Sequence, residues 1–291
     1  MKYIVVTGGT GFIGTNLIKS LLKKGYQNII SLDNYSTGNK KNHIKNSNIK
    51  YLKGDTQNFS KIFEKYKKKI KVIFHFAEFS RIAQSFDNRT KCFDSNIKGT
   101  YEVIDFCLLN KIKIIYSATS ACLGDNGKDQ NLSPYAFSKS NNMNLIMNLN
   151  EWYDLKYEII YFYNVYGPYQ IYNTSMAAVM GVFEDCYNKN LPLPVVKPGT
   201  QTRKFTHVED TVNACIYAWK QNRNFHYSIS SKRSISIINL AKLFTNNIKL
   251  VAERRGERFK SSVVNNIRGK KIINLIGSKS LVGYINKIKR L

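Results

Sequence analysis

The chain has 291 residues, 43% of them hydrophobic and 22% charged, and its 45 Lys and Arg against 19 Asp and Glu give a net charge of +26. This composition excludes a collagen-like or disordered chain, and no apolar run reaches the roughly 18 residues that a membrane span needs. Five scattered Cys without a C-x-x-C motif argue against a disulfide framework and against a zinc ribbon. The first residues also lack the layout of a signal peptide, so we expect a cytoplasmic protein without a membrane partner.

The basic residues are spread along the whole chain, among many Asn and Ile, and the densest run is Lys65–Lys71. That run ends a predicted helix, where cations suit the helix dipole. Reading or stacking on bases would need basic and aromatic side chains gathered on one face. We therefore expect no nucleic-acid partner, and the functional meaning of the positive charge stays open.

Short apolar runs alternate with longer segments of helical periodicity in the first half of the chain. The predicted strands are 3–7, 28–32, 49–52, 71–76, 112–117 and 158–162, and the predicted helices cover 12–24, 93–109 and 135–153. This alternation predicts an α/β fold with a Rossmann-type, doubly wound parallel sheet. We expect that domain to cover 1–166, and a smaller, irregular C-terminal lobe to cover 167–291, with about 205–225 packing back on the first domain.

A glycine-rich turn, Gly8–Gly14, joins the first predicted strand to the first helix. Its glycines permit unusual dihedral angles and let the backbone approach a pyrophosphate at the amino terminus of the helix. Asp33 ends the second strand, where a carboxylate can accept hydrogen bonds from both hydroxyls of an adenosine ribose. The carboxylate would repel a 2′-phosphate, which favours NAD over NADP, although Lys40 and Lys41 are near enough in sequence to leave NADP open. The alternative is that the glycines only turn the loop and that Asp33 caps a helix.

Tyr135 and Lys139 are four residues apart at the start of a predicted helix, so they share one face of it. A nearby cation lowers the pKa of a phenol and makes it a usable base near neutral pH. The preceding strand ends in Ser117–Ser120, and a hydroxyl there could share the proton of a substrate alcohol with Tyr135. The alternative is a surface pair without a functional role.

Several motifs, in order along nearly the whole chain, resemble the extended short-chain dehydrogenase/reductases. Within that group the chain is similar to the NAD-dependent epimerase/dehydratase family, and most of all to its UDP-glucose 4-epimerase-like proteins. The motifs are the glycine turn, Asp33, Asn96–Thr100, the Ser/Thr strand end, Tyr135 with Lys139, Phe162–Pro168, Pro198–Arg203 and Arg254–Glu257.

The resemblance implies a role for each matching residue. NAD would be held by Gly8, Gly11, Phe12, Ile13, Gly14, Asp33, Asn34, Asp55, Thr56, Phe76, Ala77, Asn96, Ser117, Tyr135 and Lys139. The implied catalytic residues are Thr119, Tyr135 and Lys139, with Ser117 or Ser120 as the fallback for Thr119. Lys139 would hold the nicotinamide ribose and lower the pKa of Tyr135. A nucleotide-diphosphate sugar would be bound by Thr119, Asn164, Arg203 and Arg254, although each Arg could equally lie on a solvated face. No metal is implied, and His43, His75, His207 and His226 have no ligand-like spacing.

The implied reaction is a 4-epimerisation of a nucleotide sugar, by transient oxidation at C4 to a 4-keto sugar and return of the hydride to the opposite face. A natural setting is the supply of polysaccharide or glycan precursors. Relatives that dehydrate such sugars carry an Asp-Glu pair directly after the catalytic hydroxyl, where this chain has Ser120 and Ala121. The alternatives are a C4 dehydrogenase, a 4,6-dehydratase, and a catalytically silent NAD-sensing or RNA-binding protein.

The sequence also departs from the family pattern in ways that put substrate choice in doubt. The segment Gly124–Leu132 is a short loop over the expected active site, and Lys204 stands where Arg-Asp is usual. Glu78 and Arg81 fall in the loop after the fourth strand, close to the expected pocket.

The predicted helices at 93–109 and 135–153 have apolar residues on more than one face. These residues are Val103, Ile104, Phe106, Leu108, Leu109, Met143, Leu145, Ile146, Leu149 and Trp152. In relatives, two such helices from each subunit form a four-helix interface, so the resemblance implies a homodimer. The alternative is that these residues pack on the sheet.

Overall fold

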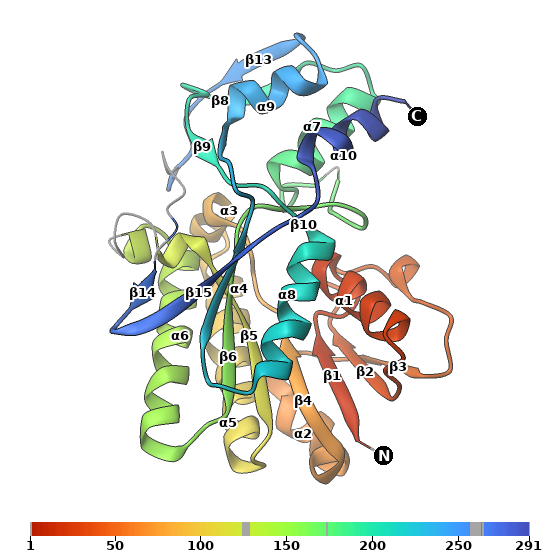
Figure 1. Cartoon of the computed structure of the whole chain (residues 1–291), viewed down its shortest axis with the longest axis vertical. Helices are drawn as coiled ribbons and strands as arrows, with labels where there is room; N and C mark the ends of the chain where they lie inside the picture. The colour runs from red at the N-terminus through yellow and green to blue at the C-terminus, as the bar shows by residue number, and fades with distance from the viewer. Residues whose placement is uncertain (1, 124–128, 173, 257–262, 264, 291) are drawn as a thin grey trace.

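The computed structural model describes residues 2–123, 129–172, 174–256, 263 and 265–290 (Figure 1). Its largest element is a nine-stranded sheet in the order β14-β15-β11-β6-β5-β4-β1-β2-β3, parallel throughout except for the edge pair β14 and β15. The strands are β1 (Tyr3–Thr7), β2 (Ile29–Asp33), β3 (Ile49–Lys53), β4 (Ile70–His75), β5 (Lys113–Thr119), β6 (Tyr157–Phe162), β11 (His226–Ser230), β14 (Asn266–Ile267) and β15 (Lys270–Ile276). The doubly wound α/β fold predicted from the sequence is confirmed.

Each face of the sheet is covered by helices, because alternate strand residues point to opposite faces. One apolar core contains Val5, Ile30, Ile73 and Ile114 and is covered by α2 (Phe59–Phe63), α5 (Thr100–Leu109) and α6 (Pro134–Tyr153). The other contains Ile4, Val6, Phe74 and Ile115 and is covered by α1 (Phe12–Lys23) and α8 (Val208–Gln221). Strands β1, β4 and β5 are thus buried from both sides, and their carboxyl ends open toward the upper part of Figure 1.

The six predicted strands are present within two residues at each end, and so are the helices expected at 12–24 and 135–153. The helix expected at 93–109 differs: it is preceded by α3 (Ile82–Asp87) and consists of α4 (Arg89–Phe93), a π-type turn η4 (Asp94–Gly99) and α5. At Gly99 the chain passes so close to Thr56 that a Cβ would lie 2.2 Å from its Oγ1. The π-type turn lets the backbone at Gly99 pass close to Thr56. Asn96, in the same turn, is fully buried.

The second half of the chain divides its residues between the sheet and a separate lobe. Helix α8 packs along α1, and β11 and β15 extend the sheet beyond β6. The lobe contains three short strand pairs: β7 (Val165–Tyr166) with β10 (Thr206–His207), β8 (Leu193–Val196) with β13 (Ile248–Val251), and β9 (Thr202–Arg203) with β12 (Ile235–Ser236). Its helices are α7 (Val179–Asn188), α9 (Ile237–Phe244) and α10 (Leu281–Ile288). They enclose a core of their own around Tyr166, Phe183 and Leu240.

A buried ion pair holds the amino ends of β5 and β6 together. Glu158 is fully buried and accepts a hydrogen bond of 2.6 Å from the Lys113 ammonium. Its carboxylate also accepts from the backbone amides of Arg223, Asn224 and Phe225, which form the turn between α8 and β11. One carboxylate thus joins β5, β6 and the turn between α8 and β11.

We expect Glu158→Ala to lower the free energy of unfolding by about 3 kcal/mol, because it leaves a buried ammonium without its counter-charge. Urea unfolding followed by circular dichroism measures this. The matched control is Glu151→Ala, whose exposed carboxylate lies 3.5 Å from Lys270 and should cost less than about 1 kcal/mol. Equal losses in the two variants would contradict the assignment.

Candidate active site

The glycine turn lies between the carboxyl end of β1 and the start of α1, and its backbone is packed too closely for side chains. Gly8 has a φ of +68°, and a Cβ on it would lie 3.0 Å from the backbone of Phe76 and Ala77. A Cβ on Gly14 would lie 2.1 Å from the carbonyl oxygen of Gly8. The turn therefore keeps an open backbone surface at the amino terminus of α1, which begins at Phe12 and Ile13. Such a surface fits a pyrophosphate, as the sequence predicts.

Asp33 lies at the end of β2 beside a hollow of about 380 Å³ that is lined by Asn34, Tyr35, Gly38, Asn39, Lys40 and Lys53. Its carboxylate accepts hydrogen bonds from the amides of Thr10 (3.0 Å) and Tyr35 (2.8 Å). Gly38 approaches it so closely that a Cβ there would lie 2.8 Å from Asp33 Oδ1. The buried hydroxyl of Thr10 has no hydrogen-bond partner. A fixed carboxylate and a free polar group beside a hollow fit the ribose of an adenosine.

Asn34, which lines this hollow, also contacts the residue before η2 (Thr56–Asn58). The side-chain amide of Asn34 donates to Asp55 at 2.9 Å, and Asp55 also accepts from the amide of Gln57 at 3.1 Å. Thr56 is buried. Of the three residues predicted at this end of the cofactor, Asn34 and Asp55 are thus brought together.

The chain after β4 is anchored from two sides. Thr7 Oγ1 accepts hydrogen bonds from the amides of Phe76 and Ala77, at 3.1 and 3.2 Å. Asn96 holds the next residues: its side chain accepts from the amide of Phe79 at 2.6 Å and donates to the carbonyl of Phe79 at 3.0 Å and to Ser138 at 3.1 Å. The buried Asn96 therefore shapes the cofactor side of the site by holding this loop, and a direct contact with the cofactor stays a prediction.

Thr119 and Tyr135 are brought together by the end of β5 and the start of α6. Ser133 caps α6 by accepting from the amide of Ala136 at 3.1 Å, and the amide of Tyr135 donates to Ser85 at 3.2 Å. The Tyr135 phenol is buried, which raises its pKa above the ordinary value, while its hydrogen bond with Thr119 lowers it. The fallback hydroxyl of Ser117 points into the protein and donates to the carbonyl of His75 at 3.0 Å. Thr119 is thus the hydroxyl of this strand end that meets the phenol.

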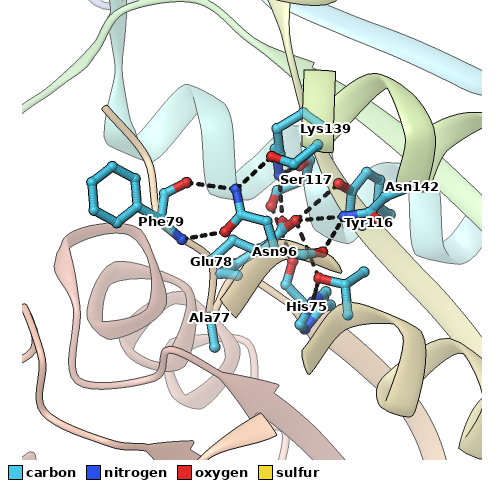
Figure 2. A network of polar contacts seen from close by, with 12 residues as sticks. His75, Ala77, Glu78, Phe79, Asn96, Tyr116, Ser117, Lys139 and Asn142 are labelled. Carbon is cyan, nitrogen blue, oxygen red and sulfur yellow. Dashed lines mark hydrogen bonds and ion pairs between the residues drawn. The ribbon is translucent and has the colours of Figure 1, made fainter. Parts of the chain in front are cut away.

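Lys139 lies one turn along α6 from Tyr135, and its partner is Glu78, which the sequence connects only with substrate choice. The Lys139 ammonium forms an ion pair with Glu78 and donates to the carbonyl of Ser117, as Figure 2 shows. Only 5% of the Lys139 side chain and 3% of the Glu78 side chain are exposed. Burial and the charge of Glu78 raise the pKa of Tyr135, whereas Thr119 and the charge of Arg81 lower it. A lowering of that pKa by Lys139, as expected from the sequence, stays a prediction.

Besides Thr119, three residues are predicted to bind substrate, and two of them, Asn164 and Arg203, donate hydrogen bonds to nearby carbonyls. Asn164 has a φ of +33° and donates to the carbonyl of Lys204 at 3.2 Å. Arg203, in β9, donates to the carbonyl of Thr202 at 2.9 Å. Arg254 is exposed, while its neighbour Arg255 stacks 4.3 Å over the ring of Phe86. Gly124, from which Thr119 was located, and Glu257 lie outside the described residues.

His75 lies beneath the site and is buried. Its Nδ1 lies 2.8 Å from Thr7 Oγ1 and its Nε2 lies 2.9 Å from Thr100 Oγ1. Burial lowers the pKa of His75 to about 4, so its imidazole is neutral at physiological pH. Within the described ranges, no three or more His, Cys, Asp or Glu are grouped as a metal site would require.

A sequence model of the NAD-dependent epimerase/dehydratase family matches residues 4–230. A putative UDP-glucose 4-epimerase of Methanocaldococcus jannaschii is 31% identical over 75% of this chain and 74% of its own length. The human dTDP-D-glucose 4,6-dehydratase is 29% identical over 88% of this chain and 76% of its own.

The structure is similar to that of a UDP-N-acetylglucosamine 4-epimerase from Methanobrevibacter ruminantium M1, solved with UDP-N-acetylmuramic acid. The TM-score is 0.80 at 27% identity, over 89% of this chain and 88% of the other. None of the described helices is both long and apolar enough to span a membrane.

We expect Asp33→Asn to weaken NAD binding about 10-fold, because a charge-assisted hydrogen bond is worth about 1.5–3 kcal/mol. Loss of the negative charge should at the same time raise the affinity for NADP relative to NAD, helped by Lys40 and Lys53 in the same hollow. Isothermal titration calorimetry with both dinucleotides measures this, and Asp185→Asn on α7 is the control. An unchanged ratio of the two affinities would remove Asp33 from the ribose site.

Proposed function

The chain belongs to the NAD-dependent epimerase/dehydratase family, and NAD is its cofactor; from this premise we propose that it is a nucleotide-sugar 4-epimerase. The observation that carries the proposal is that Thr119 acts directly on the buried phenol of Tyr135, whose pKa it lowers, with no carboxylate at the two positions after Thr119. Those positions are Ser120 and Ala121, both buried in the short helix η5 (Ser120–Cys122). The site thus offers groups for moving one proton at a hydroxyl and none there for eliminating water.

The glycine turn and the hollow beside Asp33 fit NAD, and Gly8, Gly14, Asp33 and Lys139 are the residues that we propose to hold it. Bound NAD would supply reversible oxidation at C4 of the sugar. Tyr135, once deprotonated, would accept the proton of the C4 hydroxyl and later return it.

Thr119 would hold that hydroxyl in line with the phenol, as its hydrogen bond with Tyr135 indicates. Epimerisation would further require that the 4-keto sugar turn over between the two proton transfers, so that C4 is reduced from its opposite face while the proton returns to its oxygen. The open, loop-rich lobe around β7, β9 and β12 is where we expect the sugar to find room for this.

We propose that the substrate is a nucleotide-diphosphate sugar bound by Asn164, Arg203 and Arg254. Guanidinium groups are suited to the diphosphate because they can donate two parallel hydrogen bonds to its oxygens. The epimerases to which the chain is similar carry UDP-sugars in their names.

Dehydration is the second candidate, since a 4,6-dehydratase is among the relatives. It needs an acid and a base for the C5–C6 step, as paired carboxylates supply in the relatives that perform it. Ser120 and Ala121 provide neither, which is why we place epimerisation first. A C4 dehydrogenase would need only Tyr135 and Thr119, and it differs in releasing a reduced cofactor.

The test is to incubate the purified protein with UDP-glucose, UDP-N-acetylglucosamine and UDP-glucuronate and to follow the anomeric protons by NMR. We expect one C4 epimer pair to interconvert without added cofactor. Tyr135→Phe should reduce the rate by at least about 100-fold, because the proton acceptor is lost. Tyr153→Phe, at the exposed end of the same helix, should leave the rate unchanged. A 4-keto-6-deoxy product, or accumulation of free NADH, would replace the epimerase assignment.

We also propose that the protein is a homodimer through α5 and α6. Their inner residues, such as Val103, Phe106 and Ile146, pack on the sheet. Their outer faces border a groove of about 760 Å³, which Tyr101, Glu102 and Leu145 help to line. The large apolar residues Tyr101, Leu109 and Trp152 are 51%, 74% and 63% exposed on these helices. Apolar side chains gathered on two neighbouring helices are suited to pairing with a second copy.

Leu145→Arg should convert the dimer to a monomer, because it places a charge in the centre of the proposed interface. Multi-angle light scattering at micromolar concentration measures the mass. Val282→Arg changes an exposed apolar residue on α10, outside this groove, and should remain dimeric. A monomeric wild-type protein would overturn the interface.

A further inference from the structure

Glu78 forms four hydrogen bonds to side chains, all inside the protein (Figure 2). Its Oε1 accepts from Thr100 Oγ1 at 3.2 Å, from the Tyr116 hydroxyl at 3.0 Å and from the Asn142 amide at 3.1 Å. Its Oε2 accepts from the Lys139 ammonium. All four partners donate to the Glu78 carboxylate, so a proton on that carboxylate would have no acceptor among them. The network therefore holds Glu78 as the anion.

The hydrogen atoms of the neighbouring groups can be assigned from the same network. Thr7 Oγ1 accepts from two backbone amides, which leaves its own hydrogen for His75 Nδ1. The neutral His75 then carries its hydrogen on Nε2 and donates it to Thr100 Oγ1. Thr100 in turn donates to Glu78. A continuous chain of donors therefore runs from the end of β1 to Glu78 and fixes the charge of the carboxylate.

Two of the three hydrogens of the Lys139 ammonium point to Glu78 and to the carbonyl of Ser117. The ammonium also lies 4.5 Å from the centre of the Tyr116 ring, so its position is determined from three sides. The carboxylate is thus the counter-charge of Lys139, which is the cation that stands one helical turn from Tyr135.

We propose that Glu78 is a positioning residue of the proposed epimerase: it fixes the Lys139 ammonium and supplies its counter-charge one helical turn from Tyr135. The inference rests on the proposed function for the role of Tyr135 as base. The effect of the Glu78 charge on the protonation of Tyr135 is a property of the free protein, so it can be tested without turnover.

Among the other titratable and charged groups around this cluster, Cys122 also raises the pKa of Tyr135. His75 on β4 is neutral, and burial raises the pKa of Tyr116 on β5 and of Cys92 on α4, so both are uncharged near neutral pH. Cys122 of η5 is buried. Arg81, before α3, is a cation and lowers the pKa of Tyr135, whereas Glu78 raises it. Glu78 is therefore the carboxylate whose charge opposes that of Arg81 at the phenol.

The first experiment measures the pH dependence of kcat in Glu78→Gln, which removes the charge and keeps the shape. We expect the acidic inflection to move to lower pH by about one unit, because an anion that favours the protonated phenol has been removed. Glu78→Asp keeps the charge and should have an inflection closer to that of the wild type than to that of Glu78→Gln. An unmoved inflection, or one at higher pH, in Glu78→Gln would overturn the proposal.

The second experiment needs no turnover. Tyrosine labelled with ¹³C at Cζ is titrated by NMR in the free protein, and Tyr135→Phe identifies the resonance of Tyr135. We expect this resonance to titrate about one pH unit lower in Glu78→Gln than in the wild type. Lys139→Gln leaves the carboxylate unopposed, so the same resonance should titrate at higher pH than in the wild type. Equal titration in the wild type and both variants would overturn the proposal even if the enzyme is active.

Glu158→Gln is the matched control, because Glu158 with Lys113 is a second buried pair of the same kind at the opposite ends of the strands. It should leave the Tyr135 titration unchanged. If no sugar epimerises but the resonance of Tyr135 shifts as expected, the proposed function fails and the role of Glu78 stands. If epimerisation is found and the resonance does not shift, the role of Glu78 fails alone.

Discussion

The requirement that a buried ammonium have a counter-charge determines the arrangement of this site. Lys139 is almost fully enclosed, and desolvation of a lone cation at this depth would cost several kcal/mol. Glu78 supplies the charge, but it is itself buried and needs its own donors, which Thr100, Tyr116 and Asn142 provide. These partners come from α5, β5 and α6. The ion pair therefore requires a hydrogen-bond donor from each of these three elements.

The same requirement explains the local backbone of the loop after β4. Glu78 can reach Lys139 only if the chain turns inward directly after Ala77, and Asn96 holds that turn by pairing with both the amide and the carbonyl of Phe79. Asn96 can do so because the π-type turn in η4 directs it into the protein. The irregular turn, which interrupts an otherwise apolar helix, is thus a condition of the ion pair at the site.

The parts that sequence predicts well are those whose causes are local. The glycine turn, the strands and the start of α6 follow from short patterns, and Asp33 follows from its place at a strand end. Glu78 and Lys139 are 61 residues apart in the chain, and no periodicity relates them, so their pairing could not be found. Glu78 stood out only as an ionisable residue in a loop near the expected pocket. The return of β11 and β15 to the sheet was equally hidden, because it depends on strand pairing across the whole chain.

The position of the negative charge also bears on the choice between reactions. A carboxylate that protonates a leaving hydroxyl must face the substrate, and the two positions beside Thr119 hold none. Glu78 is the carboxylate of the hydrogen-bond network around Lys139, yet all four side chains that it pairs with donate from within the protein and only 3% of its own side chain is exposed. It is therefore placed to act on the protonation of Tyr135 through Lys139, and not on the sugar. In this site the anion, Glu78, is paired with Lys139, and the residues after Thr119 are the neutral Ser120 and Ala121. Such a site is suited to moving one proton to and from a substrate hydroxyl.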